Sequence, residues 1–243
     1  YALQLRGTSN QQRTYFASIG AITGAVAWTQ ISDGDFTGLN HSGKIEHMDG
    51  YAFILTDNNL IWNSDLNSLA SCASTSFLAK QIQQDEAVGL ARFKNQILAF
   101  GSRTVEVFYN AGNSTGSPLS RIAHLHTGIG LIDTVWGSGT HYYAVSENHL
   151  YFVGRRSGGG SSSVSTTGVS PSLGFFVYNG QGFEKVSTTY IDKILSQNFE
   201  SIYSVNSIGF GGQNGIAVGF TAPGVSPQQF IVFFPDWKEW FEW

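Results

Sequence analysis

The chain of 243 residues has little charge, a single cysteine and no long apolar run. Charged residues make up 12% of it, about half the share of an ordinary soluble domain. One cysteine excludes an intramolecular disulfide framework, and we interpret Cys72 as a small buried hydrophobic residue. The longest strongly apolar run, Phe230 to Phe234, is far shorter than the roughly 20 residues of a membrane-spanning helix.

The charges that are present do not form a basic surface. The formal net charge is -4, so the electrostatic signature of a protein that grips duplex DNA is missing, and any contact with DNA is expected to be passive. The first residues, Tyr1 to Arg6, show neither a basic and apolar leader nor an initiator Met. We therefore expect the chain to be a piece of a longer protein.

Aromatic residues and turn signals are abundant. Aromatic side chains account for 14% of the chain, and they favour β-sheets because they pack against neighbours on adjacent strands. A repeated unit of short apolar segments separated by tight polar turns occurs four times. In the first copy the turn Asp49-Gly50 joins two such segments, and Asp-Gly suits the positive φ angles of a type I′ hairpin turn.

The four copies predict one kind of fold. They cover residues 45–62, 88–109, 141–186 and 202–243, and the third is interrupted by a Gly- and Ser-rich stretch at 156–173 that we expect to be a flexible insertion. Four strands per copy and a repeat of about 45 residues are typical of propeller blades. We predict an all-β protein, a complete or partial β-propeller of four-stranded antiparallel blades that forms one domain over residues 1–243.

Segments outside the copies carry weaker signals. Thr14–Ala17 and Ala25–Trp28 resemble strands that could belong to another blade, and residues 32–35 are rich in turn formers. Thr189 to Gln197 has helical spacing and predicts a short helix.

The sequence contains aspartates and histidines that could act in catalysis or bind a metal, but their pattern does not predict such a site. Asp33, Asp35 and Asp49 could be paired carboxylates of a glycosidase, yet each lies beside a glycine, where short acidic side chains satisfy turn amides. His124 and His126 would share one strand face, and a metal site would need a third ligand that the sequence does not identify. We expect no catalytic site, no metal and no cofactor.

One stretch resembles a known family. Residues 97–112, ILAFGSRTVEVFYNAG, followed by Pro118-Leu-Ser-Arg-Ile122, resemble the packaged-DNA stabilisation proteins, also called tail hub or head-completion proteins, of short-tailed bacteriophages. Further short matches follow in the same order: Gly128-Ile-Gly130, Phe176 to Gly180, Val186 to Thr188, Ile191 to Ile194, and Phe233 to Trp237 with Trp240.

The resemblance implies a structural protein of the phage virion, made in the host cytoplasm. Such a protein would form a cyclic ring with other copies of itself below the portal, retain packaged DNA and attach a tail fibre, spike or plug protein. It would need no membrane and no catalysis. Two other functions stay open, which are a carbohydrate-binding or glycan-cleaving propeller and a tail receptor-binding or nozzle subunit.

Candidate contact residues follow from this reading. Aromatic residues in loops and at strand ends are the usual anchors of subunit contacts, and an arginine pair in a Gly-rich loop is able to reach DNA phosphates. The interface candidates are Tyr109, Trp136, Trp237 and Trp240, and the candidates for a DNA-facing loop are Arg155 and Arg156.

Overall fold

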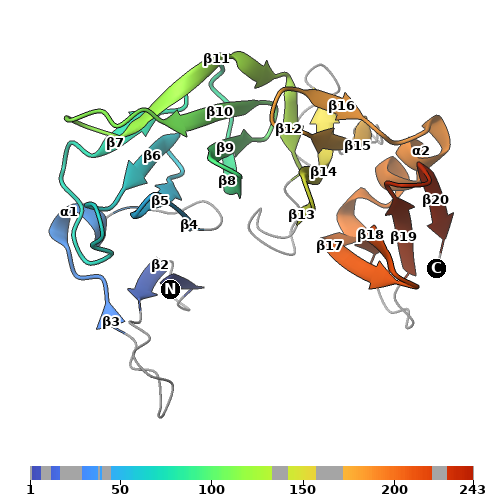
Figure 1. The fold of residues 1–243 in the computed structure, drawn as a ribbon, viewed down its shortest axis with the longest axis horizontal. Coiled ribbons are helices and arrows are strands. Elements are labelled where there is room, and N and C mark those ends of the chain that lie inside the picture. The colour runs from blue at the N-terminus through green and yellow to red at the C-terminus, as the bar shows by residue number, and fades with distance from the viewer. Residues whose placement is uncertain are drawn as a thin grey trace. The chain divides into compact units, whose positions relative to one another are not determined.

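The computed structural model describes residues 2–6, 12–16, 29–37, 39, 45–132, 142–156, 172–220 and 229–242. Most of the regular structure in these ranges is β-strand, gathered into five sheets (Figure 1). Contacts between Cα atoms divide the chain into two compact units. Unit 1 comprises Tyr1–Ala99 and Glu106–Ile122, and unit 2 comprises Phe100–Val105 and Ala123–Trp243. That residues 1–243 form a single domain stays a prediction.

The first sheet has three antiparallel strands, β1 (Ala2–Arg6), β2 (Gln12–Phe16) and β3 (Thr29–Gln30), in that order. The strand expected near Thr14 is present, whereas that expected at Ala25–Trp28 lies outside the described residues. A four-residue helix, α1 (Gly34–Thr37), follows where the sequence predicted a turn. Asp33 begins it, because its Oδ1 accepts a hydrogen bond from the backbone N of Asp35 at 2.9 Å.

The second sheet matches the first repeated copy. It contains β4 (Glu46–Met48), β5 (Tyr51–Leu55), β6 (Leu60–Asn63) and β7 (Phe77–Ala79), each paired with the next. The hairpin turn between β4 and β5 has the predicted geometry, with φ of 52° at Asp49 and 84° at Gly50. The short strand β7 completes the four.

The third sheet contains the three segments of the second copy and a fourth strand, β11, that lies beyond its predicted bounds. Its strands are β8 (Ala87–Phe93), β9 (Gln96–Gly101), β10 (Val105–Asn110) and β11 (Leu119–Thr127), in the order β11-β10-β9-β8. Within unit 1 the second and third sheets share one core, in which β4 and β5 lie against β8. The core includes Met48, Phe53, Leu90, Ile97 and Phe108, all fully or almost fully buried.

The fourth sheet has five strands but is four strands wide. It contains β12 (Ile129–Leu131), β13 (Tyr143–Ser146), β14 (His149–Arg156), β15 (Leu173–Tyr178) and β16 (Phe183–Lys185). Strands β13 and β12 pair with successive parts of β14, while β15 pairs with the other edge of β14 and β16 with β15. The two short strands therefore share one position.

The fifth sheet follows a helix that the sequence predicted. Helix α2 (Thr189–Gln197) begins after Thr188, whose side chain accepts a hydrogen bond from the backbone N of Ile191, and the 3-10 turn η1 (Phe199–Ser201) follows it. The sheet contains β17 (Ile202–Phe210), β18 (Gln213–Phe220), β19 (Gln229–Phe234) and β20 (Glu239–Glu242), with successive strands antiparallel.

Within unit 2 the fourth and fifth sheets pack face to face through aromatic side chains. Phe175 of β15 lies edge-on to Phe233 and Trp240, with ring centroids 6.3 and 5.2 Å apart. Tyr151 of β14 packs on Phe233 as well, at 6.1 Å. Open four-strand-wide antiparallel sheets, packed on their chain neighbours within each unit, confirm the predicted propeller-type, all-β fold.

Only the ends of the predicted insertion at 156–173 are described. Arg156 ends β14 and Leu173 begins β15, and the residues between 156 and 172 lie outside the described residues. Among the described residues no helix has the length and apolar character needed to cross a membrane.

Candidate interaction sites

The predicted interface aromatics fall into two environments. Tyr109, at the end of β10, is 43% exposed, and Trp237, in the turn between β19 and β20, is 53% exposed. Trp240 is half-buried and packs on the core, and its indole Nε1 donates to the backbone O of Val186 at 3.3 Å. Trp136 lies outside the described residues. Tyr109 and Trp237 are therefore the two candidates with side chains accessible on their own unit.

Trp237 belongs to an aromatic cluster on one face of the fifth sheet. Its ring lies 5.0 Å from that of Phe234 and 6.0 Å from that of Phe241. The strand register places Val232 opposite Phe241 on this face, and Val232 packs with Ala217 and Phe234 in a small buried cluster. The opposite face of the same sheet carries Phe233 and Trp240. The sheet is thus apolar on both faces, as expected for an element with neighbours on both sides.

The arginine pair is placed differently from the prediction. The sequence put Arg155 and Arg156 at the start of a flexible loop, whereas both lie in strand β14, and Arg155 is only 7% exposed. Burial, and then the positive charge of Arg103, lower the pKa of Arg155. Arg156 ends the strand and is exposed. In unit 2, therefore, only Arg156 of the pair presents its side chain to solvent.

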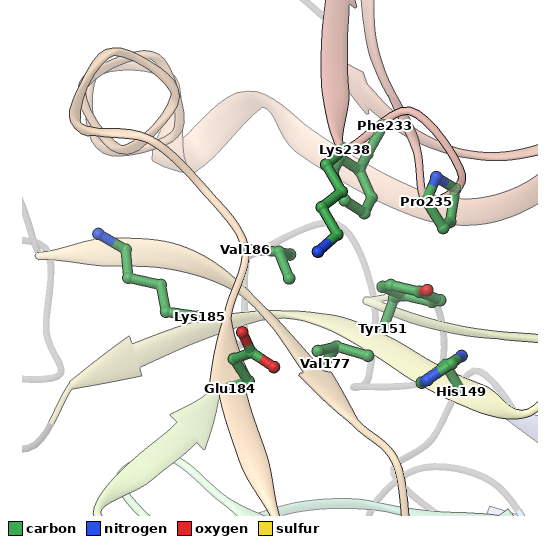
Figure 2. A pocket seen from close by; sticks show the side chains of 9 residues that line it. All are labelled: His149, Tyr151, Val177, Glu184, Lys185, Val186, Phe233, Pro235 and Lys238. Atoms are coloured by element: carbon green, nitrogen blue, oxygen red, sulfur yellow. The ribbon is translucent and has the colours of Figure 1, made fainter.

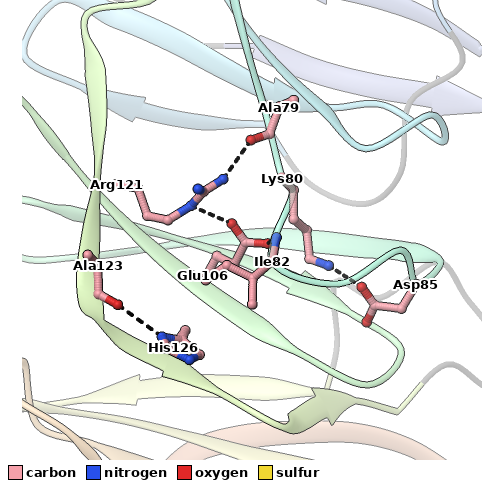
Figure 3. A network of polar contacts seen from close by, with 8 residues as sticks. All are labelled: Ala79, Lys80, Ile82, Asp85, Glu106, Arg121, Ala123 and His126. Carbon is pink, nitrogen blue, oxygen red and sulfur yellow. Dashed lines mark hydrogen bonds and ion pairs between the residues drawn. The ribbon is translucent and has the colours of Figure 1, made fainter.

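A polar network in unit 1 fixes the connection between β7 and β8 (Figure 3). Glu106 of β10 is fully buried; its Oε1 accepts from the backbone N of Ile82 at 2.8 Å and its Oε2 from Arg121 Nε at 2.7 Å. Arg121 Nη2 also donates to the backbone O of Ala79 at 3.0 Å. Two side chains of the third sheet thereby hold the chain that arrives from the second sheet.

A second ion pair reinforces the same connection. Lys80 and Asp85 lie at its two ends, their side chains are almost completely buried, and the ammonium contacts the carboxylate (Figure 3). Charged side chains are rarely buried unless they are paired. The sequence motif contained Glu106 and Arg121, but sequence reasoning gave neither a role, because residues 79–82 meet them only in the folded chain.

A cavity of about 370 Å³ opens in unit 2 between the fourth sheet and the turn from β19 to β20 (Figure 2). Tyr151, Val177 and Glu184 line it from three adjacent strands, where the register places them side by side. Phe233 and Lys238 line it from the other side. Burial, and then the charges of Glu147 and Asp236, raise the pKa of Tyr151 to about 12, so its phenol is a neutral hydrogen-bonding group at neutral pH.

Sequence reasoning proposed no residue of this cavity. Its members lie in segments that were correctly predicted as strands, but a strand pattern does not show which faces of two sheets leave a space between them. The row formed by Tyr151, Val177 and Glu184 has no counterpart in sequence spacing, because its members come from three separate strands.

The acidic and histidine candidates occupy structural positions. Asp33 caps α1 and also accepts from the backbone N of Cys72 at 3.3 Å, while Asp49 Oδ2 accepts from Asn110 Nδ2 at 2.9 Å. His124 and His126 are exposed on β11. In the described part of the chain no three His, Cys, Asp or Glu side chains gather as metal ligands.

Comparison with known proteins identifies the family of the chain. The model of the family described as Bacteriophage P22 Gp10, beta-propeller, matches residues 8–207. The chain belongs to this family. This membership confirms the resemblance that residues 97–122 carry and the propeller type of the sheets of the chain. The P22 Gp10 family is one of phage structural proteins, which supports a place in the virion.

The family motifs now have structural explanations. Glu106 and Arg121 form the network that holds the β7–β8 connection. Gly130, from the Gly128-Ile-Gly130 match, lies in β12, where a Cβ atom would come within 2.2 Å of backbone atoms of Ser102 and Arg103. Only glycine permits that approach.

Solved structures resemble the chain at low identity. A quinohemoprotein alcohol dehydrogenase from Comamonas testosteroni shares 10% identity, with a TM-score of 0.49, over 84% of this chain and 35% of its own. The computationally designed Ika8 protein shares 12% identity, with a TM-score of 0.43, over 96% of this chain and 58% of its own. At these TM-scores neither likeness carries an argument about fold or function. No curated protein matches the chain.

Proposed function

We propose that the chain is a structural subunit of a phage tail that forms a hub or adaptor ring below the portal, retains packaged DNA and attaches other tail components. The observation that carries the proposal is the family match over residues 8–207, joined to sheets of the propeller type that the family description names. Copies of the chain itself, the portal or an adaptor, and a fibre, spike or plug protein are the partners in this proposal.

The packing within each unit suits a rigid building block. In unit 1 the second and third sheets share one core, and two ion pairs with buried carboxylates hold the connection between β7 and β8. Rigid subunits lose little conformational entropy on assembly, which favours a permanent ring. Trp237 and Tyr109 are the proposed anchors, because exposed aromatic side chains contribute strongly to subunit contacts.

Contact with DNA is passive in this proposal. The net charge is -4, and Arg155 is buried in a strand, so a large share of affinity from neutralised phosphates is not expected. The ring would retain DNA by closing the exit below the portal, and the surface around that exit would need no basic patch.

Electron cryo-microscopy of the phage particle tests the position. We expect this chain in a ring beneath the portal, and particles assembled without it should package DNA and then lose it. Density for the chain at the distal tip of the tail, or particles that keep their DNA when the chain is absent, would reject the hub and favour a receptor-binding or nozzle subunit.

A Trp237→Ala phage separates the ring contact from folding. If Trp237 anchors the ring, the purified variant should keep the melting temperature of the unchanged protein while the particles lose the ring. Glu200→Ala, a change at another exposed position of unit 2, is the matched control and should assemble normally.

A further inference from the structure

Asparagine is followed by glycine at two positions of unit 2, Asn179-Gly180 and Asn214-Gly215. Such a pair is able to react with itself, because the backbone N of the glycine attacks the side-chain carbonyl carbon of the asparagine to close a cyclic imide. Glycine favours the reaction, since it has no Cβ atom to hinder the approach. Ring closure also requires the peptide between the two residues to rotate, so the local structure decides which pair reacts.

Asn179 lies in the exposed turn between β15 and β16, and its side chain is arranged for this attack. Its Oδ1 accepts hydrogen bonds from the backbone N of Gln181 at 2.8 Å and from that of Gly182 at 3.0 Å. Two donors on a carbonyl oxygen stabilise the negative charge that this oxygen acquires when a nucleophile adds to the carbon, as an oxyanion hole does. Asn179 Nδ2, the group that leaves, has no hydrogen bond with another described residue.

Asn214 is held differently, within strand β18. It pairs with Gly209 of β17 in the antiparallel ladder, and the following Gly215 is buried. Asn214 Nδ2 donates to Glu147 Oε1 at 2.7 Å, and its Oδ1 accepts no hydrogen bond from another described residue. To close the ring, the peptide between Asn214 and Gly215 would have to rotate out of the ladder and move a buried residue. The fold therefore opposes the reaction at this position.

We propose that Asn179 deamidates spontaneously in the folded protein, whereas Asn214 is protected. Gly180 N loses its proton and forms a bond to Asn179 Cγ, and the Cγ–Nδ2 bond breaks as Nδ2 takes up a proton and leaves as ammonia. Water then opens the cyclic imide at either of its carbonyl carbons, which leaves an aspartate or an isoaspartate at position 179. The proposal goes beyond the tail-hub function and does not depend on it.

Either product changes the turn between β15 and β16, because a negatively charged carboxylate replaces a neutral amide. In isoaspartate the backbone also runs through the side-chain carbons, which lengthens by one atom the turn that joins Tyr178 to its strand partner Phe183. Because the length of a hairpin loop sets the register of its strands, the pairing of β15 with β16 should loosen in the isoaspartate form. The modification thus alters one edge of the fourth sheet as the protein ages.

Peptide mapping by mass spectrometry on the folded 243-residue chain tests the site. The chain is incubated for days at mildly alkaline pH, where the backbone amide loses its proton more readily, and is then digested. Conversion of amide to acid is read from the masses of the peptides that contain Asn179 and Asn214, and isoaspartyl methyltransferase detects isoaspartate. Position 179 should convert at least about tenfold faster than position 214, which is less than the contribution of one oxyanion-hole donor to a reaction rate.

Incubation in urea separates the effect of the fold from that of the sequence. In the unfolded chain both Asn-Gly pairs are free to rotate, so positions 179 and 214 should convert at similar rates. Asn179→Gln, whose longer side chain closes the ring poorly, should stop the conversion at position 179 while position 214, in the same unit, behaves as in the unchanged protein. The proposal is overturned if position 179 stays unconverted in the folded chain, if it converts there no faster than position 214, or if position 214 stays protected in urea as well.

Discussion

Removing the Glu106 carboxylate should destabilise unit 1 more than its single position in the chain suggests. Glu106 is fully buried and accepts two hydrogen bonds, from Ile82 N and Arg121 Nε. In Glu106→Ala both donors lose their partner. Hydrogen bonds to a charged group contribute about 1.5 to 3 kcal/mol each, and breaking a buried ion pair costs about 3 to 5 kcal/mol.

The lower end of that range applies here. The Arg121 side chain keeps 28% exposure, so water hydrates part of its charge once the carboxylate is gone. We expect a loss of about 3 kcal/mol in the free energy of unfolding, which for a chain of this length is a fall in melting temperature of about 6 to 12 °C. The exposed Glu86→Ala, in the same connection, is the control and should change stability by less than about 0.5 kcal/mol.

Hydrogen exchange locates the effect. Ile82 has an exposed side chain, so protection of its amide depends on the bond to Glu106. In Glu106→Ala the peptide spanning residues 79–86 should exchange faster, even under conditions where the chain stays folded. Unchanged exchange in this peptide together with unchanged stability would refute the assigned role of Glu106.

Three further predictions concern other parts of the molecule. Gly130→Ala should lower the free energy of unfolding by about 1 to 3 kcal/mol or more, because its Cβ would meet backbone atoms that cannot move aside easily. Gly209 has open space around it, so Gly209→Ala should change stability by less than about 0.5 kcal/mol. Thermal unfolding of the two variants measures the difference. Trp240→Ala should lower the melting temperature of unit 2 markedly while Trp237→Ala does not, because only Trp240 packs between Phe175 and Phe233; equal melts would contradict this. Burial, and then nearby aspartates, raise the pKa of Cys72 from 9.0 to about 12. The stability contributed by the protonated thiol is therefore fully present below pH 9 and is lost as the pH rises from 9 to 12. Urea unfolding should show a lower free energy of unfolding at about pH 11 than at about pH 8, and Cys72→Ala should reduce this difference.

Local patterns predicted the strands well where the turn chemistry was strong. Asp49-Gly50 has the predicted positive φ angles, and helix α2 occupies the predicted residues. The short strands β7 and β12 were not predicted, because three residues carry too little periodicity to stand out. Asp33 and its neighbours were predicted as a turn, but Asp33 caps a short helix instead, a difference of local hydrogen bonding that composition does not reveal.

The candidate sites depended on contacts between distant segments. Trp237 and Trp240 lie three residues apart and were treated alike, yet Trp237 is 53% exposed, whereas Trp240 is half-buried and packs on Phe175 and Phe233. The Arg155 and Arg156 pair is divided in the same way by strand β14. The face of strand β14 separates the two arginines, whereas Trp240 lies in β20 and Trp237 lies in the turn before it.

The sequence alone predicted the all-β class, the recurrence of hairpins and the family. These features depend on apolar periodicity, turn residues and short motifs, which are local properties of the chain. The tertiary structure alone decided that Glu106 holds the β7–β8 connection, that Gly130 must lack a side chain, and that Tyr151, Glu184 and Lys238 share one cavity. Each of these depends on residues from separate strands, and only the packing of sheets brings such residues within contact distance.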